Sequence, residues 1–129
     1  MASHIDFGNH AERLAQAYLE HQGYTIVECN WWAGRGRGCL GEIDIIARKA
    51  NTLNFVEVKA RNNEITSGDF SPQAAFSMAK KERMLCAAQQ YLMLLNNGNE
   101  PQLQVQLELI AINFLPDGSH ALRHYPIEL

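Results

Sequence analysis

Charged residues stand inside two apolar stretches of the segment 41–61, and this pattern constrains the fold more than any other feature of the sequence. The stretches, residues 43–47 and 53–58, are rich in β-branched side chains and are separated by the short polar segment 49–52. Two such runs around a short connection predict a β-hairpin. Because a charge inside a strand is costly unless it is paired or solvated, this hairpin is expected to carry a polar face with a purpose.

The register of the hairpin follows if its turn is centred between Ala50 and Asn51. Asp44 then lies opposite Glu57, with their Cβ atoms about 5 Å apart. Side chains alternate along a strand, so Lys59 is expected on the same face as Glu57. The two carboxylates would repel each other, and a divalent cation between them would remove the conflict. The other face is expected to be aliphatic, with Ile43, Ile45, Val56 and Val58.

The oxygen atoms gathered on this face predict the kind of ion. Asp44, Glu57 and the carbonyl group of Val58 are hard donors, which favour Mg²⁺ or Mn²⁺ over zinc. An ion held by so few protein oxygens keeps open positions and can assist the hydrolysis of a phosphodiester. Lys59 is expected to orient the attacking water or to stabilise the charge that builds up on the phosphate.

Length and composition exclude several classes of protein. The chain has 129 residues, which fits a single domain over residues 1–129. Its start lacks the features of a signal peptide and no apolar run approaches a membrane span, which predicts a cytoplasmic protein without membrane contact. A formal net charge of −3 argues against coating of nucleic acid by bulk electrostatics. All eleven basic residues except Arg13 and Arg123 lie between Arg35 and Arg83, so any anion-binding surface is local.

Cysteine and histidine spacing adds no metal site. The three cysteines form no Cys-x-x-Cys pair and indicate neither a disulfide framework nor a zinc site. The five histidines show no metal-ligand spacing and are expected on the surface or at helix caps.

The segment before the hairpin is predicted to hold a helix and a strand. Residues 9–22 place apolar side chains at helical spacing, with Glu12 beside the stripe and Gly23 as the stop signal. A strand is expected over residues 24–30. The glycine-rich segment 34–38 then either contacts phosphates through Arg35 and Arg37 or forms a mobile hairpin loop.

The segment after the hairpin is predicted to hold a long helix. Ser71 and Pro72 supply an N-cap and a first-turn proline for a helix that runs to about Asn96. Its second half is apolar on most sides, which indicates a helix packed deep against the sheet or shared with a second subunit of a homodimer. Its first half carries a polar, basic flank, composed of Gln73, Ser77, Lys80, Lys81 and Arg83.

The end of the chain is predicted to add strands to the same sheet. An alternating strand is expected over residues 103–114, and a short edge strand over residues 121–125 that Pro126 ends. The order of elements is then helix, three strands, helix, strand and a further strand. This order predicts an α/β fold with a mixed central sheet flanked by helices.

The charged residues also carry a resemblance to known proteins. Asp44, Glu57-Val58-Lys59 and the helical Glu12 resemble the PD-(D/E)xK motif of restriction-endonuclease-like nucleases. Over most of the chain, and above all over residues 41–47 and 55–61, the sequence is similar to the YraN family of small bacterial proteins. That family is related to archaeal Holliday-junction resolvases. The segment 34–38 is longer and richer in glycine and arginine than the connection typical of the family, so substrate preference does not follow from the likeness.

The resemblance implies a restriction-endonuclease-like αβββαβ core and an Mg²⁺-dependent nuclease. Its catalytic residues would be Glu12, Asp44, Glu57 and Lys59, and its metal ligands Glu12, Asp44, Glu57 and Val58. The residues expected to contact nucleic acid are Arg35, Arg37, Arg61, Gln73 and Lys80.

Three functions remain open at this point. The leading one is an endonuclease that cleaves DNA, branched or single-stranded, with Mg²⁺ or Mn²⁺. The second is a non-catalytic nucleic-acid-binding accessory protein in recombination, repair or uptake of DNA, and the third is a structural subunit assembled through its long helix. Two opposed acids facing a polyanion favour the first, because binding alone gains nothing from them. The charges also allow a plain surface of ion pairs, in which Lys59 neutralises Glu57 and Asp44 pairs with Arg48 or Arg61.

Overall fold

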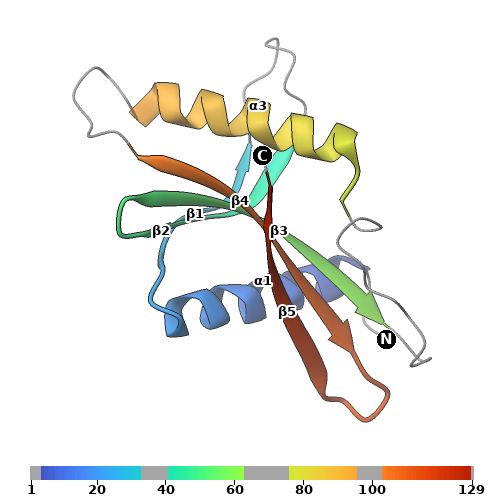
Figure 1. Ribbon diagram of the computed structural model, residues 1–129. Coiled ribbons are helices and arrows are strands. Elements are labelled where there is room, and N and C mark those ends of the chain that lie inside the picture. The colour runs from blue at the N-terminus through green and yellow to red at the C-terminus, as the bar shows by residue number, and fades with distance from the viewer. Residues whose placement is uncertain (1–3, 33–40, 63–75, 96–102, 129) are drawn as a thin grey trace.

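A five-stranded mixed sheet with a helix on each face makes up the fold in the computed structural model, which describes residues 4–32, 41–62, 76–95 and 103–128 (Figure 1). The strands lie in the order β1-β2-β3-β4-β5, with β3 and β4 parallel and the other neighbours antiparallel. The predicted α/β fold with a mixed sheet is confirmed. The elements are α1 His4–His21, β1 Thr25–Trp32, β2 Glu42–Lys49, β3 Thr52–Asn62, α3 Met78–Leu95, β4 Gln104–Phe114 and β5 His120–Ile127.

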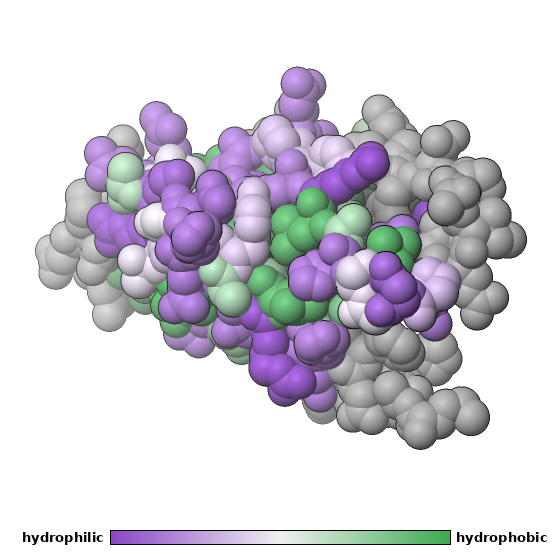
Figure 2. All heavy atoms as spheres, turned by 90° about the horizontal axis from the view of Figure 1, so that it is seen from below, coloured by the Kyte–Doolittle hydropathy of each residue, from purple (hydrophilic) through white to green (hydrophobic). Residues whose placement is uncertain are grey.

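Helix α1 packs one apolar stripe against the sheet, as its spacing predicts. Ala11, Ala15 and Leu19 are fully buried in this stripe. The helix ends where Gly23 adopts a φ of 95°, a left-handed conformation that glycine takes without steric cost. The N–H of Tyr24 then donates to the carbonyl oxygen of Leu19 at 2.9 Å, which closes a Schellman motif. Seen from below, on the side of α1, the surface is mostly polar with small apolar areas (Figure 2).

Helix α3 begins later than the sequence suggests. Residues 76–77 are not helical, so the prediction of one helix running from Ser71 and Pro72 is wrong. Ser77 is the actual N-cap, because its Oγ accepts a hydrogen bond from the backbone N–H of Lys80 at 3.1 Å. Ser71 and Pro72 themselves lie outside the described residues.

One face of α3 covers the sheet and the other is exposed. Met84, Ala87 and Tyr91 are buried against the strands, whereas Met93 and Leu94 are 67% and 69% exposed. Of the two alternatives expected for this half of the helix, packing deep against the sheet does not hold for its outer face, and sharing with a second subunit stays a prediction.

The hairpin of β2 and β3 has the predicted register. The strands pair from Ile45 opposite Val56 to Lys49 opposite Thr52. Two separate apolar cores lie on its two sides: Ile46 packs on the side of α3, and Ile45 and Val56 pack on the side of α1.

The expectation of one continuous aliphatic face is wrong at Ile43. This side chain packs with the α3 core, although strict alternation from Ile45 would place it with the α1 core. Strand β2 loses its pairing with β3 beyond Ile45, so its N-terminal end is free to change its twist there.

Ala50, in the hairpin turn, adopts a φ of 54°, and this strain gives a stability prediction. A left-handed conformation costs a residue with a Cβ atom about 1 kcal/mol, while glycine adopts it freely. Ala50→Gly is expected to raise the free energy of unfolding by up to about 1 kcal/mol in urea denaturation, less the entropy that glycine adds to the unfolded chain. Asn51→Gly, at the neighbouring turn residue, is the control and should not stabilise. Equal effects of the two variants would contradict the assignment of strain to Ala50.

Strand β5 continues past the residue that was predicted to end it. Pro126 lies within the strand, opposite Glu108 of β4, and the strand runs on to Ile127. Proline lacks an N–H group, but β5 is an edge strand, where a missing donor costs no ladder bond on the outer side. The prediction that Pro126 ends the strand is therefore wrong.

Two further sequence expectations have a structural outcome. None of the described helices is long and apolar enough to cross a membrane.

Cys29 is an exposed free thiol. Cys86 is disulfide-bonded, so the interpretation of the cysteines as free thiols is wrong for this residue.

Candidate functional site

The sheet opens between β2 and β3, and this fork builds the candidate site. The described pairs between the two strands end at Ile45 and Val56. Beyond this point β2 stays paired with β1 as far as Glu42, and β3 stays paired with β4 as far as Asn62. Figure 1 shows the start of β2 and the end of β3 running apart. Where two strands separate, the backbone N–H and C=O groups that would have paired across them need other hydrogen-bond partners, which side chains can supply.

Asp44 and Glu57 are the first residues inside the fork. The Oδ2 atom of Asp44 accepts the backbone N–H of Val58 at 2.8 Å, so a side chain replaces the missing ladder bond. Glu57 is only 6% exposed, and its carboxyl group interacts with that of Asp44. Burial, followed by the charge of Glu57, raises the pKa of Asp44 to about 8. The two carboxyl groups are therefore neighbours, as the register predicts, and the raised pKa of Asp44 favours its protonated form.

Lys80 of α3, and not Lys59, neutralises Glu57. The Nζ atom of Lys80 forms an ion pair with Oε2 of Glu57. Lys59 is exposed and makes no hydrogen bond or ion pair in the part of the chain that the structure describes. Arg48 donates to the carbonyl oxygen of Ala50 at 3.2 Å. The alternative of a surface ion pair between Lys59 and Glu57 is therefore not found, and the cation comes from the helix that covers the sheet.

The ion pair gives a second stability prediction. Lys80→Met is expected to lower the free energy of unfolding by about 2 kcal/mol, because it leaves a buried carboxylate without its cation. The effect falls short of that for a fully buried pair, since the Lys80 side chain is 30% exposed. The double variant Lys80→Met/Glu57→Gln should recover most of the loss in urea denaturation. A single variant as stable as the wild type would show that the pair contributes nothing.

Glu12 of α1 lies close to the carboxyl pair without joining it. Burial raises the pKa of Glu12, a hydrogen bond from the Asn30 side chain opposes this, and the charges of Glu42 and Glu57 raise it further. Its own charge contributes to the raised pKa of Asp44. Among the described residues, however, no three His, Cys, Asp or Glu side chains converge closely enough to hold an ion together. The donors in contact are the two carboxyl groups of the fork.

Of the five residues expected to contact nucleic acid, the structure describes two. Lys80 lies at the carboxyl pair, and Arg61 is exposed near the end of β3. Arg35, Arg37 and Gln73 lie outside the described residues.

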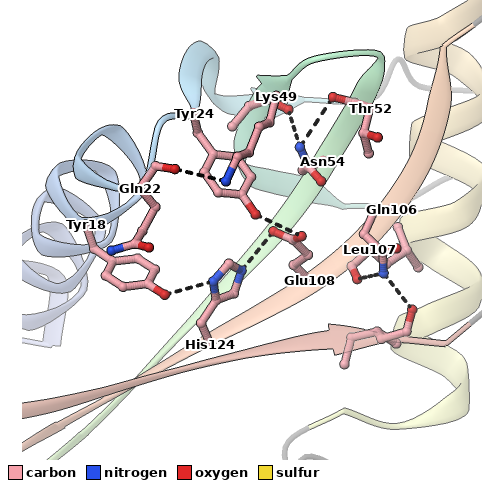
Figure 3. A network of polar contacts seen from close by, with 12 residues as sticks. Tyr18, Gln22, Tyr24, Lys49, Thr52, Asn54, Gln106, Leu107, Glu108 and His124 are labelled. Atoms are coloured by element: carbon pink, nitrogen blue, oxygen red, sulfur yellow. Dashed lines mark hydrogen bonds and ion pairs between the residues drawn. The ribbon is translucent and has the colours of Figure 1, made fainter.

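A partly buried polar network on the α1 side does not follow from the sequence pattern (Figure 3). The ring of His124 joins the hydroxyl of Tyr18, 3.1 Å from Nδ1, to the carboxylate of Glu108, 2.9 Å from Nε2. Tyr24 donates to the same carboxylate at 3.4 Å, and burial, followed by the charge of Glu108, raises the Tyr24 pKa to about 12. The expectation of a surface histidine is thus wrong at His124. The network ties α1 to β4 and β5 and so fixes the helix that carries Glu12.

Comparison with known proteins identifies the family. The model of the family described as "Uncharacterised protein family UPF0102" matches residues 11–112 of this chain. A UPF0102 protein of Desulforapulum autotrophicum is 46% identical over 86 residues, which cover 67% of this chain and 64% of that protein. One of Flavobacterium psychrophilum is 37% identical over 113 residues, 87% of this chain and 84% of that protein. One of Syntrophus aciditrophicus is 33% identical over 118 residues, 92% of this chain and 84% of that protein. This chain therefore belongs to the UPF0102 family, the YraN family that its motifs resemble.

Proposed function

We propose that this protein is a divalent-metal-dependent endonuclease that cleaves DNA. The observation that carries the proposal is that the carboxyl groups of Asp44, which is half-buried, and Glu57, which is buried, interact at the fork of the sheet. Such a pair is costly to fold, because burial and like charge both oppose ionisation. Costly arrangements of this kind are concentrated at functional sites.

The donor set suits Mg²⁺ or Mn²⁺. Mg²⁺ is commonly bound through one or two carboxylates, with waters and substrate phosphates completing its shell. Two carboxyl groups in contact, with a third acid nearby on α1, meet that requirement, whereas a closed zinc site needs more protein ligands. When bound, the ion would supply Lewis acidity to phosphodiester hydrolysis.

The residues of the chain have separate roles in the proposed reaction. Asp44 and Glu57 would hold the ion, and the Val58 N–H keeps the Asp44 carboxylate in place. Lys80 has its ammonium group at Glu57 and, with the ion in place, is available to a phosphate oxygen. Lys59 projects from the face of Glu57 without a protein partner among the described residues and stabilises charge on the reacting phosphate.

The arrangement of elements supports a restriction-endonuclease-like core as part of the proposal. A hairpin carries both acids, and α3 then crosses over to β4, which lies parallel to β3. The crossover helix supplies the cation at the site. Kinship to resolvases is an analogy at the level of fold, and the choice of DNA as substrate rests on it.

A second candidate is binding of nucleic acid without turnover. It is favoured by the ion pair between Lys80 and Glu57, which neutralises one acid without a metal ion, and by the lack of a three-acid cluster among the described residues.

One experiment separates the two candidates. The protein is incubated with Mg²⁺ or Mn²⁺ and a panel of single-stranded, duplex, flap and four-way-junction DNA, beside Asp44→Ala purified in the same way. The endonuclease should cut at least one substrate, and the variant should not. Equal cleavage by both proteins would indicate contamination and remove the proposal. Binding without cleavage in either metal would select the second candidate.

A further inference from the structure

A pocket adjoins the carboxyl pair and contains a second cation. Lys80 and Arg83 stand three residues apart on α3, and both face the first residues of β2 across a pocket of about 210 Å³. Residues three apart on a helix are neighbours on one side of it. The described residues that line it are Gly41, Glu42, Ile43, Lys80, Arg83, Met84 and Ala87.

One part of the pocket lining is apolar, and another part carries charged side chains. Ile43, Met84 and Ala87 are buried and make an apolar wall. Arg83 is exposed and forms no hydrogen bond or ion pair with any residue of the structure as described. Because Lys80 lies at Glu57 and serves the reacting phosphate, Arg83 is the cation of this pocket that is left for a neighbouring phosphate.

We infer that this pocket takes an unpaired nucleotide next to the phosphate that is cleaved, with Arg83 bound to the neighbouring phosphate. The inference rests on the proposed function, since it places the reacting phosphate at Asp44 and Glu57. A phosphate alone would need only the guanidinium, whereas the apolar wall suits the sugar and the base. A base can enter such a recess only when it is not stacked in a duplex. The substrate class is therefore single-stranded DNA, or branched DNA with an unpaired strand at the cleavage position.

Binding to a fluorescein-labelled oligothymidylate and to a duplex of the same length tests the inference by anisotropy, with Ca²⁺ in place of Mg²⁺ to prevent cleavage. Arg83→Ala should weaken single-strand binding about 10-fold and reduce the slope of log K against log salt by about 0.7. Arg83→Lys should restore most of the affinity. Arg123→Ala makes the same charge change at an exposed position of β5 and should change the affinity less than about 2-fold.

An abasic strand of the same length separates base binding from backbone binding. The wild type should bind oligothymidylate at least about 5-fold more tightly than the abasic strand. Equal affinities, an equal loss in Arg83→Ala and Arg123→Ala, or an equal loss for duplex and single strand would each overturn the inference. Cleavage is scored separately: loss of single-strand preference with cleavage intact removes only this inference. Single-strand binding that depends on Arg83, without any cleavage, would contradict the proposed nuclease activity but support the nucleotide pocket.

Discussion

Glu57→Gln is expected to reduce metal-dependent DNA cleavage by at least about 1,000-fold, the range found when an electrostatic group at a reacting centre is removed. Glutamine has nearly the same shape but supplies no negative charge to the ion. The effect should fall on the rate at saturating DNA, because Lys80 and the substrate-binding residues remain. Initial rates on the best substrate of the DNA panel measure it.

Glu108→Gln is the matched control, because Glu57 and Glu108 are each 6% exposed and Glu108 lies in the separate network with His124. This variant loses a structural carboxylate but should keep cleavage within a few fold once folding is verified by circular dichroism. Comparable losses in both variants would mean that buried charge supports the fold and not the reaction. Full activity of Glu57→Gln would remove Glu57 from the site.

Asp44 is expected to make the metal-free protein less stable as pH rises. Its pKa is raised from an ordinary value of 3.8 to about 8 in the folded state, by burial and then by Glu57. Between these values the folded protein holds a proton that the unfolded chain has released, so its contribution to stability is complete below the lower value and is lost as pH rises toward the upper one. The slope from this one group approaches about 1.4 kcal/mol per pH unit.

Urea denaturation in EDTA at several pH values measures this slope. Asp44→Asn keeps an acceptor for the Val58 N–H and should remove most of the slope, so that the variant is the more stable protein at alkaline pH. Asp117→Asn is the control at an exposed turn, where hydrogen bonds from Ser119 lower the pKa of the aspartate. That variant should keep the wild-type slope across neutral pH. A wild-type stability that rises over the same range would contradict the raised pKa of Asp44.

The features that the sequence predicts well are those set by neighbouring residues. The stripe of Ala11, Ala15 and Leu19 follows from helical spacing, and Gly23 marks the helix end. The hairpin register follows from its turn, and this register is what brings Asp44 to Glu57.

The features that the sequence does not predict are set by contacts between distant segments. Lys80 reaches Glu57 only because α3 crosses the sheet, and nothing near Glu57 distinguishes Lys80 from Lys59 as its partner. Tyr18 and His124 stand 106 residues apart, so no local pattern predicts their contact. The sequence therefore predicts the two acids and names Lys80 as a residue of the site, but not the ion pair of Lys80 with Glu57.

Binding of Mn²⁺ in the absence of DNA tests the central claim most directly. Calorimetric titration near neutral pH in two buffers of different ionisation enthalpy measures both the affinity and the protons released. The carboxyl pair of Asp44 and Glu57 predicts saturable binding that displaces the proton of Asp44, with both binding and proton release lost in Asp44→Asn. Binding that is unchanged in Asp44→Asn, or no binding by the wild type, would contradict a metal site at the fork of the sheet.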